Sequence, residues 1–133
     1  MELQPMERIY HVWFSTKGRS NALEGEVGDD IKEILRDIAQ RTGIQMMAVE
    51  ASIDHVHLLL RLTGERTLPS AMHQLKGASA RAIFVRCPDL KLDLGHDSFW
   101  QKGYGWRRIE QSEVNTVRNY IRTQRERPHR HDV

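Results

Sequence analysis

Residues 53–60, with the sequence IDHVHLLL, constrain the fold of this chain more than any other stretch. Side chains on a β-strand alternate between its two faces, so His55 and His57 point to one side, and the aliphatic residues at positions 56, 58, 60 and 62 point to the other. The aliphatic face predicts a strand that is buried against a core. Two imidazoles on one face form half of a divalent-metal site, or a hydrogen-bonded pair that binds no metal.

The rest of the chain alternates between strand-like and helix-like patterns. The expected elements are strands at 8–16, 44–52 and 55–62, helices at 25–42, 68–85 and 113–126, and an aromatic hairpin or strand pair at 98–109. The second and third strands are expected to form an antiparallel hairpin with a tight connection at 53–54. Gly43 is placed to end the first helix and Ser112 to cap the last one. Residues 86–97 contain a proline and a glycine and are expected to be irregular. The order β-α-β-β-α-β predicts an α+β fold.

Composition limits the class of protein. The chain has 133 residues, 39% hydrophobic and 29% charged, which predicts one globular domain with its core at 8–127 and a flexible basic tail at 128–133. No apolar run approaches the roughly 20 residues that cross a bilayer. The single cysteine, Cys87, cannot form an internal disulfide, so we expect a cytoplasmic protein.

Charge is distributed unevenly, although the net charge is only +2. Acidic residues gather at 24–37, whereas basic residues gather at 102–108 and at 118–130. This asymmetry favours a side that faces phosphate groups, or an ordinary solvated surface.

The last expected helix supplies candidates for the second half of a site. Tyr120 and Gln124 are four residues apart, so on a helix they share a face. A phenol has a pKa near 10 and is a poor nucleophile, but a metal ion that neutralises charge on a phosphodiester makes its attack feasible. His55, His57 and the amide oxygen of Gln124 would suit Mg²⁺ or Mn²⁺ at a phosphate. Taken singly, Tyr120 also fits helix packing and Gln124 a surface position.

Five segments, in the same order, resemble one known family. DHVHLLL is similar to the His-hydrophobic-His signature of HUH endonucleases, and NYIRTQ to the tyrosine helix of the single-tyrosine HUH transposases. YHVWFSTKGR, LKGASAR and FWQKGY resemble the first strand, a middle helix and the segment before the tyrosine helix. The likeness runs from about residue 8 to 127. The chain is thus similar to TnpA-like transposases of the IS200/IS605 insertion-sequence group.

The resemblance implies a fold, a reaction and partners. The fold would be a ferredoxin- or RRM-like antiparallel sheet packed with helices, with a C-terminal helix that bears Tyr120. Tyr120 would cleave single-stranded DNA at transposon ends through a covalent 5′-phosphotyrosine, which a second strand's 3′-OH resolves. The partners would be DNA with a subterminal hairpin and a second copy of the chain, whose tyrosine helix can complete the site in trans.

Two other functions stay open at this stage. A domesticated or inactive relative would act as a single-stranded nucleic-acid-binding module, which requires neither metal nor Tyr120. A replication-initiator-type enzyme would nick DNA without rejoining it at a new place. The small size of the chain argues against the second of these.

Several basic and aromatic residues are candidates for DNA contact, or else for solvation and packing. The basic candidates are Lys17, Arg19, Lys76, Arg81, Lys102, Arg107 and Arg108. The aromatic candidates are Trp100, Tyr104 and Trp106, of which Trp100 fits the core best. The remaining histidines are expected to serve other purposes: His11 as a strand residue, His73 and His96 as surface residues, and His129 and His131 as part of the tail.

Overall fold

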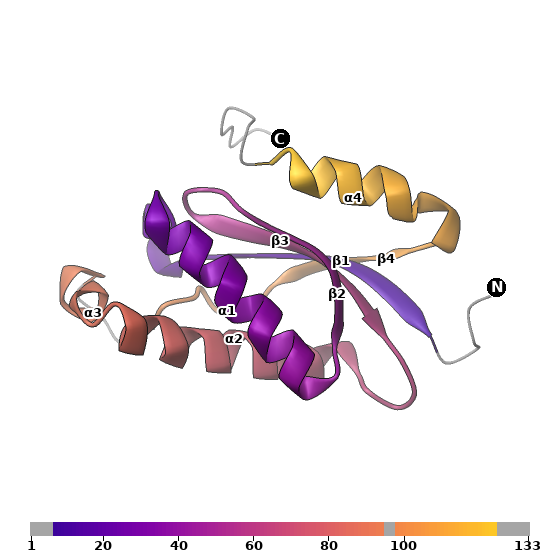
Figure 1. Ribbon diagram of the computed structural model, residues 1–133, viewed down its shortest axis with the longest axis horizontal. Helices are drawn as coiled ribbons and strands as arrows, with labels where there is room; N and C mark the ends of the chain where they lie inside the picture. The colour runs from indigo at the N-terminus through magenta and orange to yellow at the C-terminus, as the bar shows by residue number, and fades with distance from the viewer. Residues whose placement is uncertain (1–6, 95–97, 125–133) are drawn as a thin grey trace.

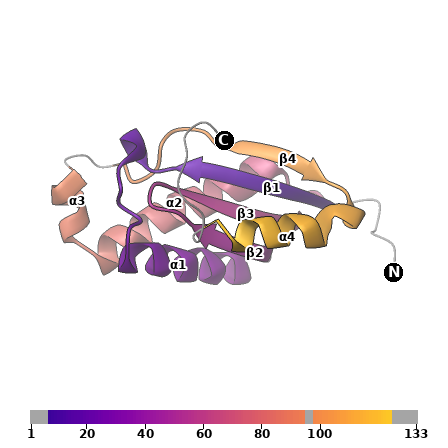
Figure 2. The ribbon, with the colours of Figure 1, turned by 90° about the horizontal axis from the view of Figure 1, so that it is seen from above.

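Four antiparallel strands form one sheet in the order β2-β3-β1-β4 (Figures 1 and 2). The computed structural model describes residues 7–94 and 98–124. The strands are β1 (Arg8–Ser15), β2 (Gln45–Ala51), β3 (His55–Leu62) and β4 (Gly105–Ile109). The helices are α1 (Glu26–Thr42), α2 (Leu68–Arg86), α3 (Asp89–Leu94) and α4 (Val114–Arg122), with 3-10 turns at Lys17–Arg19 and Gln111–Glu113. The predicted α+β class and the order β-α-β-β-α-β are confirmed.

The sheet has helices on both faces, and each face has its own hydrophobic core (Figure 1). Helices α1 and α2 cover one face, and α4 lies over β2 and β3 on the other. The smaller core, under α4, consists of Ile9, Leu59, Ile109, Val114, Val117 and Ile121. Full burial of a Val or Ile side chain contributes about 1.5–3 kcal/mol, so this core is sufficient to hold a short helix on the sheet.

Strand β3 presents two chemically different faces, as the sequence predicts. Val56, Leu58 and Leu60 are fully buried in the larger core between the sheet and helices α1 and α2. His55 and His57 point to the α4 face, because side chains alternate along a strand. The first helix also ends as expected, because Gly43 adopts a left-handed conformation with φ 75°.

The aromatic segment at 98–109 does not form the expected hairpin. Within this segment only β4 is a strand, and it pairs with β1. Trp100 forms a separate antiparallel bridge with Thr16, the residue after β1, so the two halves of the segment do not pair with each other. The chain bends between them at Lys102. The Lys76 amine donates to the carbonyls of Gln101 (2.8 Å) and Gly103 (2.6 Å) and so holds the bend against α2. These contacts between distant parts of the chain outweigh the local turn signal.

Helix α4 is shorter than expected and has a different cap. It spans Val114–Arg122, so Gln124 follows the helix, and residues 125 and 126 lie outside the described part of the chain. Ser112 is not the N-cap. Glu110 and Glu113 form a reciprocal capping box, in which each side chain accepts a hydrogen bond from the other's backbone N–H. This capping box belongs to the 3-10 turn Gln111–Glu113, which contains Ser112, and the N-cap of α4 itself is Glu113, without a side-chain capping hydrogen bond.

Two further regions differ from expectation or cannot be compared with it. Residues 89–94, expected to be irregular, form the short helix α3, which begins directly after Pro88. The expected tail at 128–133, His96, His129 and His131 lie outside the described residues. None of the helices in the described ranges combines the length and the apolar character that a membrane span requires.

Candidate active site

His55 and His57 lie at the start of β3, beside the end of α4. Their ring centroids are 5.0 Å apart and their planes are nearly perpendicular. His57 is buried, with 8% of its surface exposed, and His55 is half-buried. The backbone geometry of one strand fixes this spacing, so the pair is rigidly placed.

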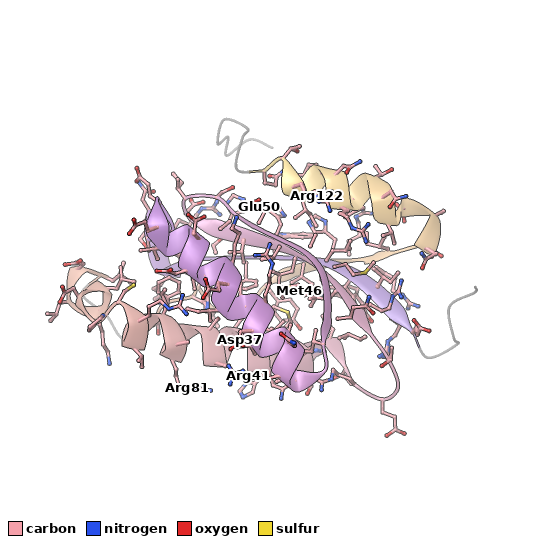
Figure 3. The ribbon with its side chains drawn as sticks, viewed as in Figure 1. Asp37, Arg41, Met46, Glu50, Arg81 and Arg122 are labelled. Carbon is pink, nitrogen blue, oxygen red and sulfur yellow. The ribbon has the colours of Figure 1, made fainter. Side chains whose placement is uncertain are left out.

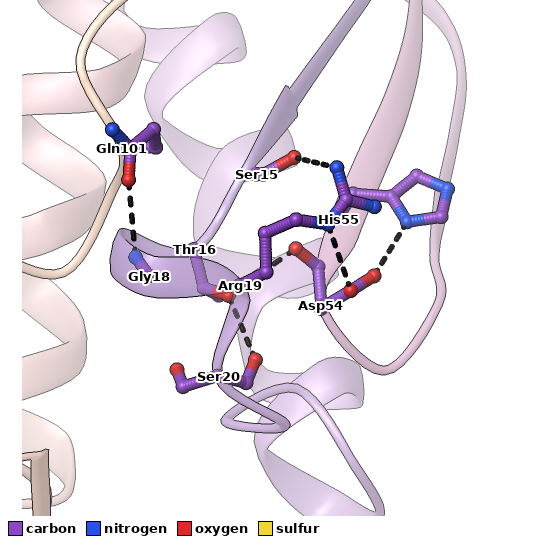
Figure 4. Close-up of polar contacts among 8 residues, drawn as sticks. All are labelled: Ser15, Thr16, Gly18, Arg19, Ser20, Asp54, His55 and Gln101. Atoms are coloured by element: carbon purple, nitrogen blue, oxygen red, sulfur yellow. Dashed lines mark hydrogen bonds and ion pairs between the residues drawn. The ribbon is translucent and has the colours of Figure 1, made fainter. Parts of the chain in front are cut away.

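The Asp54 carboxylate orients His55. His55 Nδ1 lies 2.8 Å from Asp54 Oδ1 (Figure 4). A carboxylate only accepts hydrogen bonds, so Nδ1 carries the proton and Nε2 keeps its lone pair. Asp54 is buried, and its other carboxylate oxygen accepts from Arg19 Nε at 3.3 Å. Asp54 therefore stands behind His55 as a metal ligand's supporting carboxylate does.

The turn that carries Arg19 is also fixed to Asp54. Thr16 is fully buried, and its backbone N–H donates to the Asp54 carbonyl at 2.9 Å. Its hydroxyl donates to the carbonyl of Ser20 at 2.7 Å (Figure 4). Arg19 has φ 52°, a left-handed conformation that is uncommon for a residue with a side chain. The ion pair with Asp54 offsets part of this strain.

His11, on β1, contacts Nδ1 of His57, although either imidazole can be the donor in this contact. His11 Nε2 lies 3.0 Å from His57 Nδ1. Burial, together with Arg107, lowers the pKa of His11 to about 4, and burial, together with His55 and His11, lowers the pKa of His57 to about 3. Both rings are neutral at pH 7, so a proton on His57 Nδ1 can be donated to His11 and Nε2 of His57 is left to bind a metal.

These depressed pKa values predict a loss of stability in acid. The unfolded chain binds protons on both histidines near pH 6.5, whereas the folded chain binds them only near pH 4 and below. Each histidine therefore stabilises the metal-free fold above pH 6.5 and contributes less as the pH falls, by up to about 1.4 kcal/mol per pH unit. We expect denaturant unfolding at pH 5 to give a free energy roughly 3 kcal/mol below that at pH 7.

A variant separates this effect from general acid unfolding. His11→Gln keeps a side-chain amide near His57 but cannot titrate, so the decrease between pH 7 and pH 5 should be about half as large. An unchanged pH dependence in His11→Gln would contradict the assignment.

Tyr120 lies on α4 over the two buried histidines. Its ring centroid is 6.0 Å from that of His11 and 6.0 Å from that of His57, in both cases edge-on. The side chain is 37% exposed, so a strand of DNA can reach it. The nucleophile candidate and the histidine pair thus come together within one chain, through the packing of α4 on its own sheet.

Gln124 lies close to Tyr120, and its side-chain amide is directed toward the backbone of Tyr120. Its Nε2 donates to the Tyr120 carbonyl at 3.2 Å, in the turn that follows α4. The amide oxygen is the ligand atom that the sequence suggests, and its role as a third ligand stays a prediction.

The basic candidates are in different environments. Lys76 holds the bend at 101–103, and burial lowers its pKa. Arg19 pairs with Asp54, and Arg107 pairs with Glu113 at 3.4 Å. Lys17, Arg81, Lys102 and Arg108 are exposed, with Arg81 at the outer side of α2 and far from α4, whose last turn carries Arg122 (Figure 3). A role in DNA contact stays a prediction for all seven.

The aromatic candidates divide in a similar way. Trp100 is buried, and its Nε1 donates to Ser79 Oγ at 2.9 Å, so it belongs to the core as expected. Tyr104 is half-buried against the same core. Trp106 is exposed and packs edge-on against Tyr10.

The donor atoms fit a divalent cation that binds phosphate. The two imidazoles lie on the same face of β3, and each has a partner at its Nδ1, so an Nε2 atom of each ring can be offered to a metal. In residues 7–94 and 98–124 no cluster of three or more histidines, cysteines or carboxylates forms a closed metal site. The histidine pair therefore leaves coordination positions for an amide oxygen, water or a phosphate oxygen, which an ion that acts on phosphodiesters requires.

A pair of histidines on a central strand, facing a tyrosine on a separate helix, defines the class of single-tyrosine HUH proteins. The family model described as "Transposase IS200 like" matches residues 6–124. The chain belongs to the family of IS200-like transposases.

Named relatives agree with this family. The chain is 38% identical to the ISDra2 transposase TnpA of Deinococcus radiodurans over 118 residues, which cover 89% of this chain and 84% of the relative. It is 29% identical to the transposase for insertion sequence element IS200 of Salmonella typhimurium, over 88% of this chain and 76% of the relative.

Solved structures agree as well. A crystal structure of a Deinococcus radiodurans R1 protein described as a transposase superposes with a TM-score of 0.74 at 34% identity, over 94% of this chain and 96% of that one. A REP-associated tyrosine transposase bound to a REP hairpin superposes with a TM-score of 0.65. Its identity is only 13%, over 92% of this chain and 69% of that one, so it supports the fold alone.

Sequence reasoning identified the histidines and the tyrosine but not the residues that orient them. Asp54 directly precedes His55, and this position beside a metal-ligand candidate was a usable signal. His11 was interpreted as a strand residue only. It shares the strand face of Ile9, but its contact with His57 depends on the register of β1 against β3, which the sequence does not specify.

Proposed function

We propose that this transposase cleaves and rejoins single-stranded DNA at the ends of an insertion sequence, with Tyr120 as nucleophile and His55, His57 and Gln124 as ligands of Mg²⁺ or Mn²⁺. The observation that carries the proposal is the placement of the Tyr120 ring 6.0 Å from that of His57. The carboxylate of Asp54 at His55 Nδ1 and the family membership support it further. We propose that the enzyme acts in the cytoplasm.

The chemistry is a pair of phosphoryl transfers. The Tyr120 oxygen attacks the scissile phosphorus and a P–O3′ bond breaks, which leaves a 5′-phosphotyrosine and a free 3′-OH, while the phenol proton passes through solvent to the leaving oxygen. A 3′-OH from another strand then attacks the phosphotyrosine and releases Tyr120, so the number of phosphodiester bonds is conserved. The bound cation would neutralise charge on the phosphate oxygens.

A DNA hairpin and a homodimer complete the proposal. Membership of the IS200-like transposases carries the proposal that a hairpin near each transposon end is recognised, and the structurally similar REP-associated tyrosine transposase is itself bound to a REP hairpin. Docking of α4 on the sheet of its own chain favours a site that one subunit completes, over a site completed in trans by the partner subunit.

Adduct formation tests the proposal directly. Labelled single strands from both sides of the element are incubated with the protein and Mg²⁺ or Mn²⁺, and an SDS-stable protein–DNA adduct is expected that EDTA prevents. Peptide mapping should locate the nucleotide on Tyr120. Strands that bind tightly but never form an adduct, with or without metal, would support a non-catalytic binding module instead.

A further inference from the structure

Trp13 is an exposed tryptophan on the same face of the sheet as the candidate active site. It lies on β1, with 38% of its surface exposed. Its register partner on β3 is His57, and its ring centroid is 5.0 Å from that of His11, which contacts His57. The indole therefore borders the histidine that is proposed to hold the metal.

Gly105 provides the space in which the indole lies. It is the register partner of Trp13 on β4. A Cβ atom at position 105 would lie only 2.2 Å from both Cε2 and Nε1 of Trp13, so a side chain at this position would displace the ring. The tryptophan is thus supported by backbone below while part of its surface faces solvent.

An arginine lies on either side of Trp13 along the sheet, and each is paired with a carboxylate, Arg107 with Glu113 and Arg19 with Asp54. Arg107 is paired across the strands with His11, one position along this face of the sheet. On the other side, Arg19 Nη1 lies 3.5 Å from the Ser15 hydroxyl. An aromatic surface between two guanidinium groups suits an unpaired base that is flanked by phosphates.

The two exposed tryptophans lie on different faces of the sheet, and only Trp13 shares the face of the candidate active site. Trp106 lies on the opposite face of the sheet, where Tyr10 packs against its ring at 5.8 Å. Trp13 contacts the ring of His11, is the register partner of His57 and lies over Gly105.

We infer that the Trp13 indole stacks on the unpaired base of a nucleotide next to the phosphate that Tyr120 attacks. The inference rests on the proposed function, because it places that phosphate between Tyr120 and the two histidines. The ligand class is a nucleobase of single-stranded DNA, and stacking tolerates any base because every base has a π-face.

The test combines variants of position 13 with an abasic scan. Binding of the labelled flanking strand is measured by fluorescence anisotropy in a Tyr120→Phe background, so that no cleavage occurs. In the protein that keeps Trp13, removal of the base at one position near the cleavage site should weaken binding roughly 5- to 100-fold. Trp13→Leu should bind the intact strand more weakly by a similar factor and should not respond to the missing base. Trp13→Phe should keep most of the response.

Three controls make the outcome decisive. Leu92→Ala removes an exposed apolar side chain on α3 and should leave the abasic response unchanged. Gly105→Ala should displace the indole and reproduce the behaviour of Trp13→Leu. Circular dichroism checks that each variant folds.

The inference is overturned if Trp13→Leu binds the intact strand as tightly as the Trp13 protein, or responds to the same missing base. Failure of the proposed function gives a different result. In that case the protein with Tyr120 forms no adduct, whereas the abasic response of binding still depends on Trp13.

Discussion

Tyr120→Phe should abolish the SDS-stable adduct with single-stranded DNA and lower the cleavage rate by at least about 10³-fold. The substitution removes only the nucleophilic oxygen, and loss of a covalent nucleophile has effects of this order or larger. The phenyl ring keeps its edge-on contacts with His11 and His57. DNA binding and thermal stability should therefore stay close to those of the unmodified protein.

Tyr10→Phe is the matched control for this experiment. Tyr10 is a strand tyrosine on the opposite face of the sheet, packed against Trp106, so loss of its hydroxyl should leave adduct formation intact. An adduct that persists in Tyr120→Phe and disappears in Tyr10→Phe would contradict the assignment of Tyr120, because it would identify Tyr10, on the opposite face of the sheet, as the nucleophile.

Removal of a histidine ligand should be the second large effect. His55→Ala should weaken Mn²⁺ binding by at least about 100-fold and reduce cleavage accordingly, because one of only two imidazole donors is lost. Asp54→Asn should weaken it less, by about 10- to 100-fold, because the carboxylate orients His55 without binding the metal. Calorimetry or the electron paramagnetic resonance signal of free Mn²⁺ measures the dissociation constant.

The position of His55 makes this the cleaner of the two possible ligand substitutions. His57 is buried and contacts His11 at 3.0 Å, so its loss would also leave a buried polar partner unsatisfied and reduce stability. His73→Ala, an exposed histidine on α2, is the control and should leave Mn²⁺ binding unchanged. Equal Mn²⁺ affinities in His55→Ala and His73→Ala would contradict the assigned metal site.

Local patterns were sufficient to predict most of the secondary structure and the faces of β3. Alternation placed Val56 and Leu58 in the core and His55 on the other face, and Gly43 marked the end of α1, because each depends on neighbours in the chain. The pairing of Tyr120 with the histidines came from the resemblance to a family, since no local pattern relates residues so far apart.

The remaining features depend on contacts between distant segments. The hairpin expected at 98–109 is absent because β4 pairs with β1, Trp100 bridges to Thr16 directly after β1, and Lys76 holds the bend between them. Likewise, the contact of His11 with His57 requires the register of β1 on β3. Residue propensities and turn signals specify neither which strands pair nor the register in which they pair.

The capping box in the turn between β4 and α4 controls the direction in which the helix leaves the sheet. Glu110 and Glu113 fix the joint by reciprocal hydrogen bonds, and Arg107 ties Glu113 back to β4. Tyr120 lies about two helical turns beyond Glu113, roughly 10 Å along the axis. A tilt of about 10° at the joint would therefore move the phenol by nearly 2 Å, more than the roughly 0.5 Å tolerance of a productive geometry. The position of Tyr120, the proposed nucleophile, therefore depends on a joint that lies about two helical turns away from it.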